Sequence, residues 1–304
     1  MSATRGVLTL ACGAKRYLAL AESLARSIRL RDPGEAIAVV TDAAGRNRQR
    51  FDRLGVQVVS AEASFGSGVE QKLHLDTYSP FEETLFIDAD CLVFRPLTAI
   101  WDRYRAARGF GVVAYGSLGP DDKHPAIRSL PTFLERAGID SLPAFNGGIY
   151  YFDRSPEARA VFGSARKLFG RRKELGLEKF KNAAAADEPL IAAAMRRCGV
   201  EPLAWDESAT MGTALDCFDR LGDIDVAAGR STFQKLGHEV SPTVIHFNMN
   251  AQHSRYYLRE CWRLRLGAVP GGNALAGALG WATAHQRRLR SALVRRAVSA
   301  PTPT

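Results

Sequence analysis

Short apolar runs alternate with amphipathic segments over the first part of the chain. Runs typical of buried strands occupy residues 6–11, 36–42 and 56–61, and apolar residues recur at helical spacing in residues 15–31 and 46–54. Strands and helices that alternate in this way form a parallel sheet with helices on both faces. We therefore predict an α/β fold with a mostly parallel, Rossmann-like central sheet, in which ligands bind at the carboxyl ends of the strands.

The rest of the chain continues this pattern less regularly. Further strands are predicted at residues 84–94, 110–116, 147–155 and 243–248, and further helices at residues 71–81, 156–175, 183–198 and 254–266. Residues 117–144 are polar and contain Pro and Gly, so a long irregular segment is expected there. Residues 199–240 are of mixed character, and no internal repeat is present.

The positive charge of the chain is concentrated at its carboxyl end. The net charge is +9, and residues 255–304 contain nine arginines and one glutamate, so this segment carries +8 of it. The remainder is nearly neutral, which argues against a nucleic-acid partner. We predict a main domain over residues 1–266 and, over residues 267–304, a Gly-rich linker with a basic tail. That tail is either a solvated end or a peripheral contact with anionic lipid, where each Arg contributes about 1 kcal/mol.

Cysteine usage and hydropathy predict a cytoplasmic protein. The five cysteines are dispersed and show no metal-type spacing, which suits a reducing compartment. No apolar run approaches the roughly 18 residues that cross a bilayer. The N-terminus is not interpreted as a signal peptide. Arg5 alone gives too little positive charge before the first apolar run, and an amphipathic helix follows that run directly.

Two carboxylates one residue apart, Asp88 and Asp90, interrupt an apolar run in the stretch ETLFIDADCLVF. If the stretch is one strand, both side chains point to the same face, about 7 Å apart at their backbones. Carboxylates held that close repel each other unless a cation lies between them, and Mg²⁺ or Mn²⁺ suits such oxygen ligands. The alternative is an Asx turn that ends the strand, with the second aspartate solvated.

Other polar residues lie at the ends of predicted elements, namely His246, Asn146, Asp187, Glu188 and Lys72. An imidazole suits Mn²⁺ as a third ligand, and the glycines at 147 and 148 let the backbone approach a ligand closely. The structural alternatives are a buried histidine at 246, a bulge or turn at the two glycines, N-terminal capping of a helix by Asp187 and Glu188, and a solvated surface lysine at 72.

The order of these landmarks resembles the retaining nucleotide-sugar glycosyltransferases of the GT-A fold, and most closely glycosyltransferase family 8. The resemblance spans roughly residues 6–260 and is carried by VVTD, YSPFEETLFIDADCLVF, FNGGIYYFD, DEPLI and IHFN. It implies a metal-dependent enzyme that transfers a hexose, with retention of configuration, to a saccharide or lipid-linked acceptor. The implied donor is a nucleoside-diphosphate sugar, expected to be a UDP-sugar. The acceptor is expected to bind at residues 117–144 and 199–240.

The resemblance also assigns a metal site. Asp88 and Asp90 match the D-x-D motif that binds Mn²⁺ (or Mg²⁺) and the donor, and His246 matches the histidine that completes the metal site. A Gly and then Lys-Pro-Trp commonly follow that histidine in the family and help to hold the diphosphate. They are absent here, so Arg255 or His253 is expected to replace them.

The remaining roles are assigned in the same way. Asn146 matches a residue that contacts the donor sugar, and Asp187 and Glu188 match a pair that faces the anomeric carbon, as a charge stabiliser or as a nucleophile. The other donor contacts implied are Ala11, Cys12, Tyr17, Lys72 and Gly147.

Two alternatives compete with glycosyl transfer. A haloacid-dehalogenase-type phosphotransferase also uses a D-x-D motif, with Asp88 as its nucleophile. Such enzymes carry the motif at their first strand, whereas here it lies near residue 90. A non-catalytic nucleotide-sugar-binding protein would keep the same residues without turnover.

Overall fold

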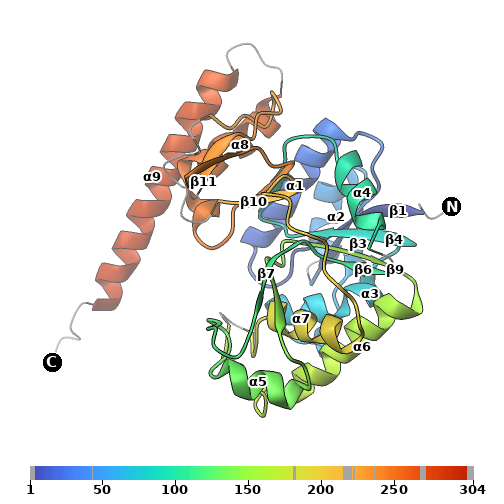
Figure 1. Ribbon diagram of the computed structural model, residues 1–304. Coiled ribbons are helices and arrows are strands. Elements are labelled where there is room, and N and C mark those ends of the chain that lie inside the picture. The colour runs from blue at the N-terminus through green and yellow to red at the C-terminus, as the bar shows by residue number, and fades with distance from the viewer. Residues whose placement is uncertain are drawn as a thin grey trace.

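The structure is a computed structural model, and it describes residues 4–42, 44–107, 109–180, 183–214, 221, 223–235, 237–267 and 272–299 (Figure 1). Its strands are β1 (Arg5–Leu10), β2 (Ile37–Thr41), β3 (Val56–Ser60), β4 (Glu83–Ile87), β5 (Cys91–Val93), β6 (Phe110–Gly111), β7 (Ala114–Leu118), β8 (Leu142–Phe145), β9 (Ile149–Asp153), β10 (Met211–Thr213), β11 (Phe233–Lys235), β12 (His238–Val240) and β13 (Val244–His246). Its helices are α1 (Arg16–Arg31), α2 (Ala44–Asp52), α3 (Leu75–Tyr78), α4 (Thr98–Arg105), α5 (Leu130–Ala137), α6 (Pro156–Gly170), α7 (Glu188–Arg197), α8 (Arg255–Leu266) and α9 (Gly272–Ser299), with 3₁₀ turns η1 (Ala63–Phe65), η2 (Gly68–His74) and η4 (Ala251–His253).

The central sheet has six strands in the order β3-β2-β1-β4-β9-β6. The strands from β3 to β4 are parallel, and β9 runs antiparallel to both of its neighbours. The predicted α/β fold with a mostly parallel central sheet is therefore confirmed.

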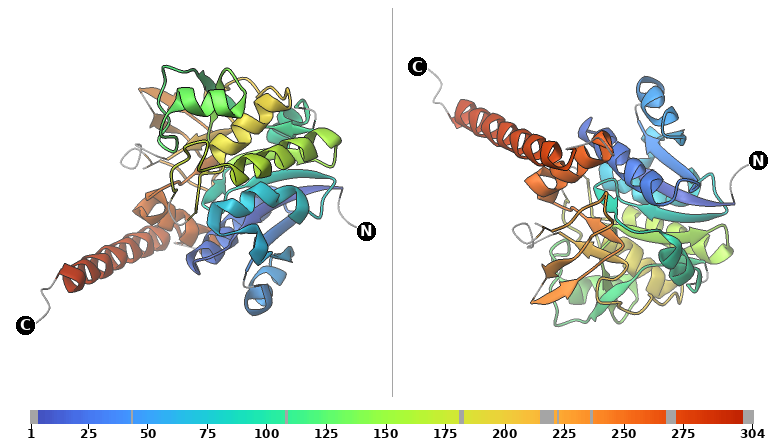
Figure 2. Two further views of the ribbon diagram at one scale, coloured as in Figure 1. Left: turned by 90° about the horizontal axis from the view of Figure 1, so that it is seen from below. Right: turned by 90° about the horizontal axis from the view of Figure 1, so that it is seen from above.

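Both faces of this sheet are buried, because consecutive strand residues point to opposite sides. In β4, Leu85 and Ile87 pack into a core with α1, α4 and α8, whereas Phe86 packs into a second core with α5, α6 and α7. Figure 2 shows these helices on opposite sides of the sheet. The strands therefore carry nearly continuous apolar runs, as the sequence shows.

Helix boundaries follow local signals. Ser155 accepts a hydrogen bond from Ala158 N (3.2 Å) and precedes Pro156 at the first turn of α6, while Ser254 caps α8 through Tyr257 N (3.2 Å).

The prediction of one continuous strand at residues 84–94 is wrong. The chain turns at Asp88, where Cys91 N donates to Asp88 O (3.0 Å), and β5 leaves the central sheet. It pairs antiparallel with β13 in a separate sheet of order β10-β13-β5. The two aspartates thus lie in a turn between two sheets, and their shared direction does not come from strand alternation.

Two other regions differ from the prediction. The single strand predicted at residues 110–116 is divided into β6 and β7. The segment 117–144, expected to be irregular, contains α5 and most of β8, which pairs antiparallel with β7. Leu130, Phe133, Leu134 and Ala137 bury one face of α5 in the second core, although polar residues surround them in the sequence.

The expected Gly-rich linker is wrong from Gly272 onward, because that residue begins α9. This helix lies beside α8 and continues beyond it, away from the body of the molecule (Figures 1 and 2). A Cβ at Gly280 would lie 2.8 Å from the backbone N and Cα of Arg259, so glycine permits this close approach. The proposed division at residue 266 stays a prediction. The side chains of the last four arginines lie outside the described residues. No described helix is long and apolar enough to cross a membrane.

We expect two neighbouring glycines of α9 to respond oppositely to alanine. Gly280→Ala should lower the free energy of unfolding, because overpacking costs about 1–3 kcal/mol and exceeds the helix-propensity gain of about 1 kcal/mol. Gly277→Ala is the matched control: its Cβ would meet no atom within 4 Å, so only the propensity gain remains and the protein should be more stable. Urea denaturation of both variants measures the difference. Equal stabilisation of both would show that α9 is not packed closely at Gly280.

Candidate functional site

A cavity of 360 Å³ lies at the carboxyl ends of β1 and β4. Its lining includes Cys12, Gly13, Arg16 and Tyr17 from the β1–α1 junction, Lys72 from η2, and both aspartates of the turn after β4. This is the edge of the sheet where the sequence predicted a ligand site.

Asp88, Asp90 and His246 converge beside this cavity. The β5–β13 pairing sets Cys91 opposite His246, and His246 Nε2 then lies 3.0 Å from Asp90 Oδ1 and 3.7 Å from Asp88 Oδ2. Phe247 N also donates to Asp90 O (2.9 Å), which ties the two segments together. Two carboxylates and an imidazole nitrogen thus meet at one place, a donor set that suits Mn²⁺ or Mg²⁺.

Asn146 determines which nitrogen of His246 faces the carboxylates. Asn146 Oδ1 accepts from Gly148 N (3.0 Å), which identifies the atom as oxygen, because a backbone N–H can only donate. The same oxygen lies 2.8 Å from His246 Nδ1, so Nδ1 carries a proton and donates it. In neutral His246 the lone pair is then on Nε2, which faces Asp90 and can bind a metal. Asn146 is therefore a positioning residue for the imidazole.

We expect Asn146→Ala to weaken Mn²⁺ binding by about 10- to 100-fold, because partners that orient a ligating histidine contribute that much to metal affinity. Mn²⁺ titration followed by electron paramagnetic resonance measures this directly. Asn250→Ala is the control, since Asn250 is exposed and its side chain caps no helix. Equal Mn²⁺ affinity of Asn146→Ala and wild type would contradict the orienting role.

Lys72 is buried between Asp88 and Asp187, the residue that precedes α7. Its Nζ lies 2.9 Å from Asp88 and 3.5 Å from Asp187 Oδ2, and it donates to Gly147 O (3.1 Å). Burial lowers the pKa of Lys72, but the charges of Asp187 and Asp88 outweigh it and raise the pKa above its usual value. Lys72 is thus a fixed cation, and the alternative of a solvated surface lysine is wrong.

Asp187 and Glu188 occupy different environments. Asp187 is 5% exposed and accepts from Tyr150 OH (2.7 Å) in addition to its pairing with Lys72. Glu188 is less buried and accepts from Gly147 N (2.7 Å). Burial, and then the charge of Asp187, raise the pKa of Glu188. Tyr150, whose role the sequence did not reveal, holds Asp187 from the neighbouring strand β9.

The charges of this site favour a bound cation. Four carboxylates surround one lysine and one histidine: Asp88, Asp90, Asp187 and Glu188. Burial raises the pKa of Asp88, and Lys72 and His246 offset this only in part. Burial by itself would also raise the pKa of Asp90, but the charge of His246 outweighs this effect, and the pKa of Asp90 is lowered. The residues present therefore fit a divalent cation.

Cys91 is a weaker candidate ligand. Its Sγ lies within 4.8 Å of ligand atoms of Asp90 and His246. Burial and the charges of Asp90 and Asp88 raise the pKa of Cys91 well above its usual value, so the thiol keeps its proton. A hard cation prefers the carboxylates.

Close packing explains the two glycines after Asn146. A Cβ at Gly147 would lie 2.5 Å from Tyr150 OH, and a Cβ at Gly148 would lie 2.6 Å from His246 Nδ1. Glycine at these positions lets the carboxylates and the imidazole approach the backbone, so the alternative of a simple turn is insufficient.

The donor contacts implied at the junction of β1 and α1 do not all line the cavity. Cys12 and Tyr17 line the cavity, whereas Ala11 is 1% exposed in the core and is not part of the lining. Arg16, for which no role was predicted, lines the cavity too and donates to Tyr17 OH (3.2 Å). Its position at the start of α1, next to Tyr17, was the available signal.

Comparison with solved structures finds the same architecture in glycosyltransferases. The galactosyltransferase LgtC, in complex with donor and acceptor sugar analogs, superimposes with a TM-score of 0.52 and 16% identity over 90% of this chain and 96% of LgtC. The chain has the GT-A glycosyltransferase fold. The bifunctional glycosyltransferase WbbM superimposes with a TM-score of 0.54 and 13% identity over 91% of this chain and 51% of WbbM. No protein-family model matches the sequence, and the comparison with curated proteins finds no relative.

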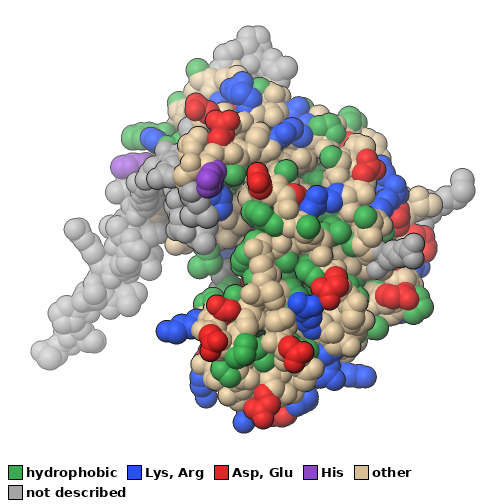
Figure 3. Space-filling view, in the orientation of Figure 1, with side chains coloured by type: hydrophobic (Ala, Val, Ile, Leu, Met, Phe, Trp, Pro, Cys, Tyr) green, Lys and Arg blue, Asp and Glu red, His purple; other side chains and the backbone are tan. Residues whose placement is uncertain are grey.

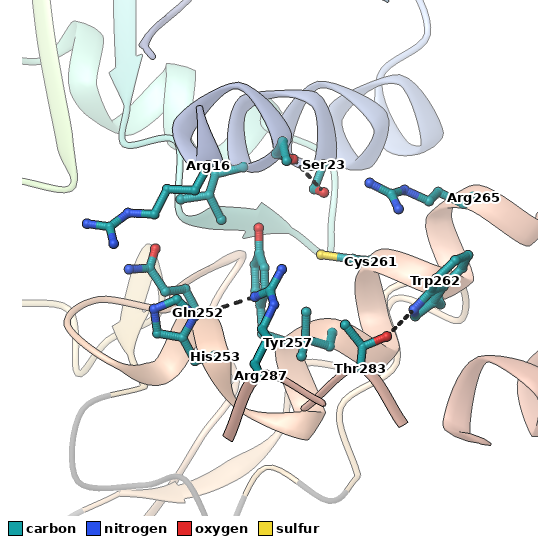
Figure 4. A pocket seen from close by; sticks show the side chains of 13 residues that line it. Arg16, Ser23, Gln252, His253, Tyr257, Cys261, Trp262, Arg265, Thr283 and Arg287 are labelled. Carbon is teal, nitrogen blue, oxygen red and sulfur yellow. Dashed lines mark hydrogen bonds between the residues drawn. The ribbon is translucent and has the colours of Figure 1, made fainter. Parts of the chain in front are cut away.

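In this GT-A fold, His253 lies in a second pocket and does not line the 360 Å³ cavity. That pocket measures 120 Å³ and is formed by α1, η4, α8 and α9 (Figure 4). His253 Nδ1 lies 3.4 Å from Arg287 Nη1 there, and Arg16 lines both cavities. Arg255 donates to Tyr256 OH (2.7 Å). Arg16 is therefore better placed than His253 to meet a ligand in the larger cavity.

Proposed function

We propose that this protein transfers a hexose from a nucleoside-diphosphate sugar, a UDP-sugar, to a saccharide or lipid-linked acceptor with retention of configuration. The observation that carries the proposal is the convergence of Asp88, Asp90 and His246 with Lys72 at the carboxyl edge of the sheet in a GT-A fold. The fold favours this activity over a phosphotransferase with Asp88 as nucleophile. A binding protein without turnover remains the second candidate, because it would use the same geometry.

Asp88, Asp90 and His246 would hold Mn²⁺ or Mg²⁺. When bound, such an ion acts as a Lewis acid on the leaving diphosphate. The chain itself contributes two positive charges to this cavity. Lys72 is fixed and buried, and Arg16 lines the cavity at the start of α1. Fixed charges in a buried site stabilise developing negative charge without reorganisation.

Retention is proposed to proceed by attack on the same face that the diphosphate leaves. The acceptor oxygen forms a bond to the anomeric carbon, the bond from that carbon to the diphosphate oxygen breaks, and the acceptor proton moves to the diphosphate. The transition state carries positive charge on the sugar, which a carboxylate nearby stabilises. Glu188 suits this role better than Asp187, because Asp187 is buried and already bound to Lys72 and Tyr150.

The base and ribose of the donor are proposed to lie along Cys12 and Tyr17, with Gly147 bringing backbone close to the sugar. Burial and the charge of Asp42 raise the pKa of Cys12 to about 12, so its thiol is a neutral contact. A cytoplasmic location and a peripheral contact of the basic tail with anionic lipid remain predictions.

The test is release of nucleoside diphosphate from a panel of UDP- and GDP-sugars, with Mn²⁺ or with EDTA. Turnover of one donor that stops with EDTA is expected, since slow donor hydrolysis commonly proceeds without an acceptor. If no donor is turned over, thermal stabilisation by UDP with Mn²⁺ would leave either an enzyme that needs its acceptor or the binding protein. No stabilisation by any nucleotide would reject both.

A further inference from the structure

An exposed aromatic pair lies beside the proposed site and takes no part in it. Among the described residues, three large aromatic side chains are exposed: Tyr115 (59%), Trp205 (47%) and Trp281 (59%). Tyr115 and Trp205 meet edge to face, with ring centroids 6.1 Å apart at 83°. Apolar side chains that gather on a surface mark binding sites more often than single ones do.

The backbone holds this pair in place. Leu203 N donates to Val112 O (2.8 Å) and Ala114 N donates to Leu203 O (3.1 Å), which makes a parallel bridge between Val113 and Leu203. Tyr115 and Trp205 each follow that bridge by two residues, so they emerge side by side.

The backbone around Tyr115 and the backbone that follows Trp205 are held by further contacts. In the antiparallel pair of β7 and β8, Ala114 pairs with Phe145 and Gly116 with Ala144, so Tyr115 is the extra residue of a bulge. Bulges redirect a side chain away from its sheet. Beyond Trp205, Asp206 pairs with Arg103 (3.5 Å) and accepts from Thr210 N (3.1 Å). Two rings on rigid backbone lose little conformational entropy when a ligand packs on them.

Strand pairing places Tyr115 close to residues of the proposed site. The β8 residue Phe145, paired with Ala114, directly precedes Asn146, which orients His246. Partial burial and then the charge of Glu188 raise the pKa of the Tyr115 hydroxyl. Neither aromatic ring lines the cavity that holds Cys12 and Tyr17. In Figure 1, β7 crosses the middle of the view, and Figure 3 shows hydrophobic side chains gathered on that part of the surface.

We propose that Tyr115 and Trp205 form a platform on which the pyranose ring of a saccharide acceptor packs, so that its hydroxyl reaches the anomeric carbon near Glu188. This inference rests on the proposed function. A pyranose has an apolar face of C–H groups and an equatorial rim of hydroxyls, which suits an apolar ring surface next to a carboxylate. Nucleobases also stack on aromatic rings, but the base is proposed to lie beyond Asp88, along Cys12 and Tyr17.

Binding is tested without turnover. Saturation-transfer NMR and tryptophan fluorescence titrations are made with lactose, cellobiose, maltose and the methyl glucosides and galactosides. Trp205→Ala is expected to weaken binding of at least one of these by about tenfold, and Trp205→Phe to restore most of it. The matched control is Trp281→Ala, which removes an exposed tryptophan from α9 and should change nothing. Equal affinity of Trp205→Ala and wild type, or no binding of any of these sugars to wild type, would overturn the platform.

Turnover separates this proposal from the proposed function. Trp205→Ala and Tyr115→Ala are expected to keep acceptor-independent donor hydrolysis within about twofold, while the KM for the glycoside that stimulates diphosphate release rises about tenfold. A higher KM for the donor in these variants would place the rings on the donor and reject the proposal. If wild type turns over no donor at all, the proposed function fails, whereas sugar binding at Trp205 is still decided by the titrations.

Discussion

Asp90→Ala is expected to reduce Mn²⁺-dependent release of nucleoside diphosphate by on the order of a thousandfold. Asp90 Oδ1 lies 3.0 Å from His246 Nε2 and is one of the three proposed ligands, so its loss leaves the divalent cation incompletely held. Preorganised charge at a leaving group is worth about 10²–10³ in kcat for one group alone, and loss of a bound cation removes more. The rate is measured with the donor that wild type uses, over a range of Mn²⁺ concentrations.

Two further variants keep this prediction specific. Asp90→Asn preserves the shape of the side chain and should lose nearly as much activity, because the charge is what holds a hard cation. Asp121→Ala removes an exposed acid from the loop after β7 and should behave as wild type. Unchanged Mn²⁺-dependent turnover in Asp90→Ala would remove this aspartate from the metal site and reopen the assignment of the D-x-D motif.

Lys72→Met is expected to lower the free energy of unfolding by about 3–5 kcal/mol, the cost of leaving a buried partner charge uncompensated. The ammonium lies 2.9 Å from Asp88 and 3.5 Å from Asp187, and no water reaches it easily, since its side chain is 8% exposed. Donor turnover should fall as well, measured without urea and well below the thermal midpoint of the variant, where the folded state predominates. Urea denaturation without added metal gives the stability change.

The control for charge alone is Lys123→Met, an exposed lysine whose loss should change stability by no more than about 0.5 kcal/mol. The double variant Lys72→Met with Asp187→Asn removes a positive and a negative group together. It should recover part of the lost stability, because contacting charges couple by about 0.5–3 kcal/mol, but it should not recover turnover. A stability loss for Lys72→Met as small as that of Lys123→Met would show that the lysine is not the buried counterion.

Local patterns were sufficient for most of the secondary structure. The apolar runs before Asp32-Pro33-Gly34 and after it became β1, α1 and β2 within about two residues, because periodicity and turn chemistry act over a few residues. The α5 helix was missed although its four buried residues have the i, i+3, i+4, i+7 spacing of an amphipathic helix, because the polar, Pro- and Gly-containing sequence around them favoured an irregular segment.

The residues of the site were predictable by type, but their contacts were not. Asp88 and Asp90 were expected to share a direction through strand alternation, whereas a turn and the pairing of β5 with β13, more than 150 positions later, bring them to His246. Lys72 resembled a surface lysine because its counterions lie at positions 88 and 187. The role of Tyr150 needed the assembled sheet, because its partner Asp187 lies 37 positions away in the sequence.

The amino-acid sequence by itself determined the α/β order of elements, the apolar strands and the supply of carboxylates, imidazole and glycines at strand ends, because these depend on neighbours in the chain. The tertiary structure alone decided which of those groups meet. Only in the folded chain does Asn146 contact His246, does Lys72 lie buried between Asp88 and Asp187, and does Tyr115 pack against Trp205. Such pairings arise from strand register and packing between distant segments, and burial then sets the charge of each group.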